Sequence, residues 1–218
     1  MKLLIKFPTR NRPNKFFKAL DTYVNFLDDP TTQIIVTCDN NDSTMTEAYV
    51  KEVVEQYNNV RMCYGDSKTK IEAVNADLND VEFDILLLAS DDMIPKVKGY
   101  DTIIKNKMKE HYPDTDGVLW FNDGHKGNEL NTLCILGKKY YDRFGYIYHP
   151  DYVSVWCDNE FMDVAKLLGK QTYFDEVIIE HQHPDWGYGQ QDVIHSINQR
   201  YEAQDKQLYT TRKLNNFN

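Results

Sequence analysis

Residues 84–95 have the sequence DILLLASDDMIP, in which a run of apolar side chains leads directly into two adjacent carboxylates. The five apolar residues from Ile85 to Ala89 are typical of a strand that is buried on both faces, as in parallel sheets. In open α/β sheets, ligands bind beyond the carboxyl ends of the strands, where Asp91 and Asp92 would stand. Two adjacent acids at that point favour a hard cation such as Mg²⁺ or Mn²⁺, because like charges otherwise repel. The alternative is that Asp91 makes a turn or cap and that Asp92 faces solvent.

The chain before this stretch alternates between predicted strands and predicted helices. Two of the helices are expected to open with a capping box, Thr44 with Glu47 and Thr69 with Glu72. Strands are expected over residues 3–7, 33–38, 60–64 and 85–89, and helices over 14–27, 44–57 and 69–79. This alternation predicts a mostly parallel sheet with right-handed crossovers.

The pattern changes after residue 95, where strands no longer alternate regularly with helices. Helices are expected over residues 100–113 and 158–168, and strands over 117–121, 132–137 (antiparallel to its neighbour) and 174–179, followed by a partly helical tail from Gln190. The length of 218 residues fits one domain. We expect a nucleotide-binding half over 1–95, an acceptor half over 96–187, and a C-terminal helix and tail over 188–218.

Charged residues follow the first two predicted strands as well. Arg10 and Arg12 stand in a loop between the first strand and a helix start, which suits a phosphate or a flat heterocycle. Asp39 ends the second strand, a position that often contacts ribose or base in nucleotide-binding sheets. The alternatives are two solvated arginines and a turn-making aspartate. The charges at the strand ends therefore converge on one edge of the predicted sheet.

Two further clusters lie in the second half of the chain. Asp158 and Glu160 stand at a predicted helix start just after Trp156, an aromatic side chain able to seat a sugar ring beside a base. The acids could instead cap the helix. His181 and His183 are two residues apart on a predicted strand end, so both rings could point at one site. Neutral histidines also serve as polar core residues, so this pair alone does not establish a metal site.

The composition excludes several functional classes. Hydrophobic residues make up 41% of the chain, and the net charge of −9 argues against general nucleic-acid binding, which needs a basic surface. The four cysteines have no CxxC spacing, so we expect buried thiols in a reducing compartment. No apolar run approaches the ~20 residues that a membrane span needs. We therefore expect a cytoplasmic protein without a transmembrane segment.

In their order and spacing, these motifs resemble a glycosyltransferase of the GT-A fold, in the broad style of glycosyltransferase family 2. The resemblance covers about residues 2–186 and is carried by FPTRNRP at 7–13, Asp39, the DXD-like Ser90-Asp91-Asp92, DNE at 158–160 and His183. It implies an α/β fold with a Rossmann-like, mostly parallel central sheet flanked by helices and a smaller antiparallel acceptor-side part.

The resemblance also implies a reaction and roles for these residues. It implies a nucleotide-sugar donor, with a UDP-sugar favoured, together with Mn²⁺ or Mg²⁺, a glycan or glycoconjugate acceptor, and inversion at the anomeric carbon. The implied contacts are Pro8, Thr9, Arg10 and Arg12 at the base and phosphates, Asp39 at the base or ribose, Asp91 at the ribose or donor sugar, Asp92 at the metal, His183 at the metal or diphosphate, Asp158 as general base, and Trp156 and His181 on the acceptor side. Two departures from the family pattern stand out: the metal-site acids are adjacent, and DNE replaces Glu-Asp, which leaves Glu160 as a rival base.

Two other functions remain open from the sequence. A nucleotidyltransferase would share the sheet and the metal, but such enzymes have a glycine-rich loop after the first strand, and residues 8–13 contain no glycine. A non-catalytic carbohydrate-binding module would use the aromatic residues without the convergent acids and arginines. We also expect the polar tail from Tyr201 to Asn218 to order over a bound donor.

Overall fold

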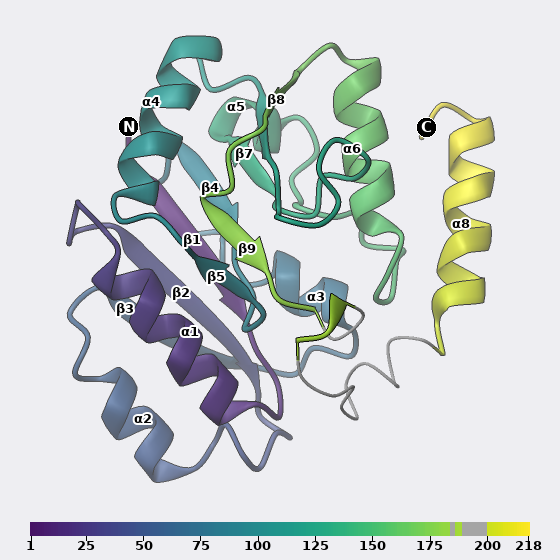
Figure 1. The fold of residues 1–218 in the computed structure, drawn as a ribbon. Coiled ribbons are helices and arrows are strands. Elements are labelled where there is room, and N and C mark those ends of the chain that lie inside the picture. Colours follow the sequence, from purple (N-terminus) through teal and green to yellow (C-terminus); the bar gives the residue numbers. More distant parts are fainter. Residues whose placement is uncertain (184–185, 189–199) are drawn as a thin grey trace.

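The computed structural model describes residues 1–183, 186–188 and 200–218, and its centre is a seven-stranded sheet (Figure 1). The strands of this sheet, in spatial order, are β3 (Val60–Gly65), β2 (Gln33–Asp39), β1 (Leu3–Pro8), β4 (Ile85–Leu88), β7 (Ile135–Gly137), β6 (Val118–Phe121) and β8 (Gln171–Phe174). A second, two-stranded sheet pairs β5 (Met93–Pro95) with β9 (Ile179–His181). The described helices are α1 (Pro13–Asn25), α2 (Ala48–Val54), α3 (Lys70–Asn75), α4 (Tyr100–His111), α5 (Lys138–Asp142), α6 (Cys157–Leu167) and α8 (Glu202–Leu214).

The first four strands of the large sheet are parallel, as the alternating pattern predicts. β1 pairs with β2 on one side and with β4 on the other, and β2 pairs with β3. The chain therefore winds in one direction from β1 to β3 and in the other from β1 to β4. A sheet whose winding reverses has a crevice at the carboxyl ends of the two strands involved, and ligands bind there. The predicted α/β fold with a mostly parallel sheet is confirmed.

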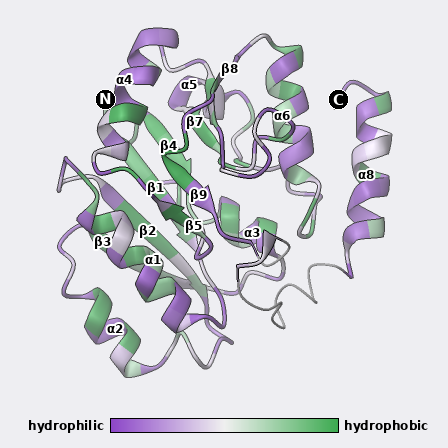
Figure 2. Ribbon diagram, in the orientation of Figure 1, coloured by the Kyte–Doolittle hydropathy of each residue, from purple (hydrophilic) through white to green (hydrophobic). Residues whose placement is uncertain are grey.

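Both faces of the sheet are covered by helices. Ile5 and Phe7 belong to a core that includes residues of α1, α2 and α4, whereas Leu4 belongs to a second core with residues of α3, α5 and α6. Successive side chains of a strand point to opposite faces, so β1 must be apolar at nearly every position. Figure 2 shows the hydrophobic strands at the centre of the molecule and hydrophilic surfaces on the outer helices.

The second half of the sheet is partly antiparallel. β7 lies between β4 and β6 and runs antiparallel to both, while β6 and β8 are parallel. The smaller sheet begins immediately after Asp92, because β5 starts at Met93 and pairs with β9 so that Met93 lies opposite His181. This pairing carries a segment from late in the chain to the crevice beside Asp92.

Several predicted boundaries were wrong. The second helix begins at Ala48, because Asp42 Oδ1 accepts hydrogen bonds from the backbone N–H (3.0 Å) and the hydroxyl (2.8 Å) of Thr44 and holds that stretch as a turn. The strand predicted over 174–179 is two strands, because β8 ends at Phe174 and β9 begins at Ile179 in a different sheet. The capping box at Thr69 is confirmed by the hydrogen bond from the Glu72 backbone N–H to Thr69 Oγ1 (3.0 Å).

The C-terminal part of the chain contains a helix. Residues 202–214 form α8, which packs against α6, and the ordering of the tail over a bound donor stays a prediction (Figure 1). The helical segment predicted from Gln190 falls on residues 189–199, outside the described part of the chain. No helix among the described residues is long and apolar enough to cross a lipid bilayer.

Candidate active site

The charged residues predicted from strand ends do meet at the carboxyl edge of the parallel strands. Arg10 and Arg12 follow β1, Asp39 ends β2, and Asp91 and Asp92 follow β4. β1 and β4 are the neighbouring strands at which the winding reverses. The site therefore occupies the crevice that this topology creates.

Two arginine–aspartate pairs line one side of the crevice. Arg10 Nη1 donates to Asp39 Oδ2, and Arg12 Nη1 donates to Asp91 Oδ1 at 2.9 Å. Thr9 Oγ1 lies 3.4 Å from Asp91 Oδ2, and Pro8 is the last residue of β1. Burial raises the pKa of the Asp91 carboxyl, and the Arg12 charge opposes that rise. A guanidinium group has five N–H donors, so each arginine can hold its aspartate and still contact a phosphate.

A second group joins Asp92, His181 and Asp123. His181 Nε2 lies 3.8 Å from Asp92 Oδ2, and His181 Nδ1 lies 3.8 Å from Asp123 Oδ2. The backbone fixes this order, because the Gln182 N–H donates to Asp92 O at 2.7 Å and the His181 N–H donates to Asp123 O at 2.9 Å. Ser90 Oγ donates to Asp92 Oδ1. The histidine therefore bridges two carboxylates that are 31 residues apart in the sequence.

The charges in this group are strongly coupled. Burial favours a lower pKa for His181, but Asp123 and Asp92 outweigh it and raise the pKa to about 9. Burial favours a higher pKa for Asp92, but His181 and Ser90 hold the pKa of that carboxyl below its usual range. Asp123 is also held below its usual pKa range despite burial, by His181, Thr132 and the backbone N–H groups of the following loop.

Asp92 and His181 are the two groups in the crevice best placed to hold a divalent cation. Their N–O separation of 3.8 Å is too long for a hydrogen bond and shorter than the roughly 4.2 Å that two ligands about 2.1 Å from one ion can span. His181 Nε2 would have to release its proton to bind the ion. No cluster of three or more metal-ligating side chains is found among the described residues. Mg²⁺-type sites commonly use one or two protein ligands, with substrate phosphates and waters filling the other positions. The donor set therefore fits such an ion.

The two histidines have different positions from those expected. His181, expected on the acceptor side, faces Asp92. His183, expected at the metal, lies two residues after His181, and its ring centroid is 5.6 Å from those of both His181 and Trp186. The sequence pattern could not separate them, because both precede a turn and lie two residues apart.

Asp158 lies in the first turn of α6, where its Oδ1 accepts a hydrogen bond from the Asn159 backbone N–H at 2.9 Å. Burial raises the pKa of its carboxyl, while the positive charge of Lys70 opposes the rise, and His181 contributes in the same direction as Lys70. Lys70 also helps to lower the pKa of Asp92. Lys70 is the first residue of α3 and was not singled out in the sequence, although it follows the Thr69 cap. The positive charges of Lys70 and His181 therefore act to lower the pKa of both Asp158 and Asp92.

Glu160 has a different environment from Asp158. Its buried carboxylate accepts hydrogen bonds from Arg212 Nε at 2.8 Å, from Arg212 Nη2 at 3.0 Å, and from the Tyr152 hydroxyl at 2.8 Å. Both oxygens thus have partners from the fold itself, one of them on α8. This arrangement ties Glu160 to the packing of α6 against α8.

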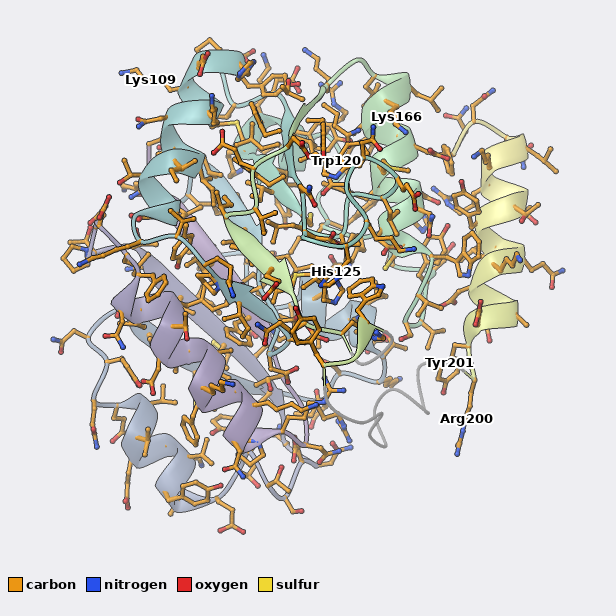
Figure 3. All side chains as sticks on the ribbon, in the orientation of Figure 1. Lys109, Trp120, His125, Lys166, Arg200 and Tyr201 are labelled. Carbon is orange, nitrogen blue, oxygen red and sulfur yellow. The ribbon has the colours of Figure 1, made fainter. Side chains whose placement is uncertain are left out.

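The aromatic residues near the site also differ from the expectation. The Trp156 ring packs against Tyr209 of α8, with centroids 5.2 Å apart, and Lys206 Nζ lies 5.2 Å from the Trp156 centroid. At the other end of the crevice, His125 stacks on Trp186 with centroids 4.5 Å apart and an interplanar angle of 8°, and Trp186 contacts the His181 ring. His125 lies beside the carboxyl end of β9 (Figure 3). An aromatic pair of His125 and Trp186 therefore lies next to His181.

Sequence comparisons give no relative. No known family profile matches the sequence, and no curated protein is similar to it. The fold, in contrast, matches solved structures.

A mannosyltransferase from Pyrobaculum calidifontis, solved with GDP-Man and Mn²⁺, has a TM-score of 0.69 and 15% sequence identity, over 86% of this chain and 58% of that chain. TarS from S. aureus, solved with UDP, has a TM-score of 0.64 and 17% identity, over 83% of this chain and 60% of that chain. The chain thus covers less than two thirds of either protein. These similarities, together with the strand order and the crevice at β1 and β4, show that the chain has the GT-A fold of glycosyltransferases.

Proposed function

We propose that this protein is a metal-dependent glycosyltransferase, which moves a sugar from a nucleotide-diphosphate donor to a hydroxyl group of a glycan or glycoconjugate. A UDP-sugar is the favoured donor. The observation that carries the proposal is the meeting of charged residues at the carboxyl edge of the parallel strands, where Arg12 pairs with Asp91 and His181 Nε2 lies 3.8 Å from Asp92 Oδ2. A carboxylate at a cation site and a second carboxylate across the crevice are the two groups that metal-assisted transfer requires.

The donor would be held by the first half of the chain. The pair of Arg10 and Asp39 is placed for the base and ribose, and Arg12 with Asp91 for the ribose, donor sugar and phosphates, with Pro8 and Thr9 at the end of β1. Asp92 and His181 would hold Mn²⁺ or Mg²⁺. The cation, when bound, would neutralise negative charge on the departing diphosphate.

Asp158 is proposed as the general base. Burial raises the pKa of its carboxyl, and a raised pKa makes a carboxylate a better proton acceptor near neutral pH. Glu160 is the weaker candidate, because Arg212 and Tyr152 already occupy its oxygens. Asp158 would take the proton of the acceptor hydroxyl as that oxygen attacks the anomeric carbon and the bond to the diphosphate breaks. Attack from the face opposite the leaving group would invert the anomeric configuration.

Calorimetric titration with UDP and GDP tests the donor side of the proposal. We expect binding of one nucleotide to depend on Mn²⁺ and to be lost in Asp92→Ala, while the exposed acid variant Asp142→Ala binds as wild type does. Binding that ignores both Mn²⁺ and Asp92 would contradict the metal-dependent mechanism. Binding of glycans without either nucleotide or metal would instead favour a carbohydrate-binding module, and tighter metal-dependent binding of a nucleoside triphosphate would favour a nucleotidyltransferase.

A further inference from the structure

The C-terminal helix α8 contacts the beginning of α6, where the proposed base lies. Trp156 packs on Tyr209, Glu160 accepts from Arg212, and Asp163 accepts from Lys213 Nζ at 2.7 Å. Figure 1 shows α8 alongside α6 at one side of the molecule, and Figure 3 places Tyr201 at its start. These contacts come before and after Asp158 in the chain.

One residue of α8 makes a different kind of contact. Asp205 has no exposed surface, and its carboxylate accepts three hydrogen bonds from consecutive backbone N–H groups. The Val153 N–H donates to Oδ1 at 3.1 Å, and those of Ser154 and Val155 donate to Oδ2 at 2.8 and 2.9 Å. Consecutive N–H groups that point at one anion form a concave binding geometry, which fixes the backbone dihedral angles of the segment. Asp205 therefore sets the shape of residues 153–155.

The segment that Asp205 holds leads directly into the first turn of α6. Trp156 is the N-cap residue and has φ +64°, a left-handed conformation that large side chains rarely adopt. Such a conformation persists only where the surrounding structure enforces it. Asp205 fixes the backbone before Trp156, and Tyr209 and Lys206 hold its ring. The backbone direction at Asp158, two residues later, depends on this conformation of Trp156.

We infer that Asp205 is a positioning residue, which aims Asp158 into the crevice by holding the backbone of residues 153–155. This inference rests on the proposed function of Asp158. Lost positioning would lower turnover and leave donor binding unchanged, because the arginine–aspartate pairs and the pair of Asp92 and His181 are built by other elements. A purely structural role would instead weaken both together.

Three variants test the inference: Asp205→Asn, Asp205→Glu, and Gln204→Ala as a control that shortens an exposed side chain of the same helix. The measurements are Mn²⁺-dependent nucleotide binding, amide hydrogen exchange of residues 152–158, and kcat and KM for nucleotide-sugar turnover with water as acceptor. In Asp205→Asn we expect faster exchange in this segment, at least a tenfold lower kcat, and nucleotide affinity and KM within twofold of wild type. Asp205→Glu retains the anion and should recover part of the kcat, and Gln204→Ala should match wild type.

The outcomes separate this inference from the proposed function. If Asp158→Asn leaves turnover unchanged, the proposed base is wrong, whatever Asp205 does. If Asp158→Asn abolishes turnover while Asp205→Asn retains normal exchange and kcat, the positioning role is wrong. A parallel loss of nucleotide binding and kcat in Asp205→Asn, without rescue by glutamate, would also overturn it, because Asp205 would then support the whole fold. If Asp205→Asn does not fold, the comparison of Asp205→Glu with Gln204→Ala by the same measurements decides.

Discussion

The two sides of the crevice are constructed differently. On the donor side, Arg10 with Asp39 and Arg12 with Asp91 pair side chains from the ends of strands that are direct neighbours in the sheet. On the proposed acceptor side, Asp158 comes from α6, which is supported by α8, and His181 reaches Asp92 from β9. The positions of the residues on the proposed donor side therefore follow from strand order alone. The positions of those on the proposed acceptor side depend on how separate segments pack.

This difference predicts how each side responds to substitution. On the proposed donor side, the carboxylates of Asp39 and Asp91 are buried and each is paired with an arginine, so losing an arginine should mainly affect stability and nucleotide binding. The residues on the proposed acceptor side are held in place by contacts with other segments of the chain. Substituting them should therefore lower turnover or metal binding more than it lowers stability. The predictions that follow test this contrast, beginning with the largest expected effect.

Replacing the proposed base should separate the two sides most clearly. In Asp158→Asn we expect kcat to fall by about 10²–10⁴-fold, the usual contribution of a general base, while nucleotide affinity stays within twofold. Glu160→Gln is the matched control, and it should lower thermal stability more than kcat because it weakens the contact with Arg212. Steady-state kinetics and calorimetry on both variants check this. A larger loss of kcat in Glu160→Gln than in Asp158→Asn would identify Glu160, and not Asp158, as the base.

Breaking a donor-side pair should have its main effect on folding. In Arg12→Met, the Asp91 carboxylate loses a charge partner while it stays buried, and we expect the free energy of unfolding to fall by about 3 kcal/mol. The double variant with Asp91→Asn should recover part of this loss, because no buried charge then remains without its arginine. Lys138→Met removes an exposed pair and should cost less than about 1 kcal/mol. Urea unfolding measures the free energy of unfolding of all three variants. Equal losses of this free energy in Arg12→Met and Lys138→Met would contradict a special contribution of the pair of Arg12 and Asp91 to stability.

The contrast also explains how much of the molecule could be predicted from its sequence. Arg10, Asp39 and Asp91 were identifiable because parallel strands end at one edge, so local motifs at strand ends must meet. Asp123 carried the same signal, because it stands in a polar loop after the strand that ends at Phe121, but it was not among the predicted site residues. The roles of Glu160 and Trp156 could not be separated from that of Asp158, because their partners Arg212 and Tyr209 lie about 50 residues away and no local pattern indicates α8 as their neighbour.

Asp123 gives a third test, on the acceptor side. Its carboxylate accepts from the backbone N–H groups of His125 (2.9 Å) and Lys126 (2.6 Å) and from the Thr132 hydroxyl (2.7 Å), and it lies next to His181 Nδ1. A carboxylate beside the ring would help to orient His181 at the proposed metal site, and the loss of an orienting partner usually costs 10–100-fold in metal affinity. We expect a loss of about that size for Mn²⁺ in Asp123→Asn, measured by calorimetry in the presence of nucleotide. Asp175→Asn, on the exposed end of β8, should bind Mn²⁺ as wild type does, and equal affinities in all three proteins would exclude this role for Asp123.

The smallest expected effect concerns Lys6, which lies beneath the donor side. Its side chain is fully buried on β1, where Nζ donates to Ala76 O at 2.7 Å and to Thr37 Oγ1 and lies 3.7 Å from Asp77 Oδ2. Burial lowers the pKa of Lys6 from 10.5 to about 8, although Asp77 opposes the shift. Lys6 thereby joins the donor-side strand to the end of α3, whose first residue, Lys70, reaches Asp158.

The sign of the resulting pH dependence follows from proton binding. Between pH 8 and 10.5 the unfolded chain keeps the Lys6 proton and the folded chain releases it, so folding stability rises with pH across this window. The contribution amounts to at most about 1.4 kcal/mol per pH unit. In Lys6→Met this term is absent, whereas tyrosines with raised pKa values affect both proteins equally. We therefore expect the difference in unfolding free energy, wild type minus Lys6→Met, to increase from pH 8 to pH 10 in urea titrations. Parallel curves would mean that Lys6 stays protonated in the folded protein and that Asp77 compensates fully for its burial.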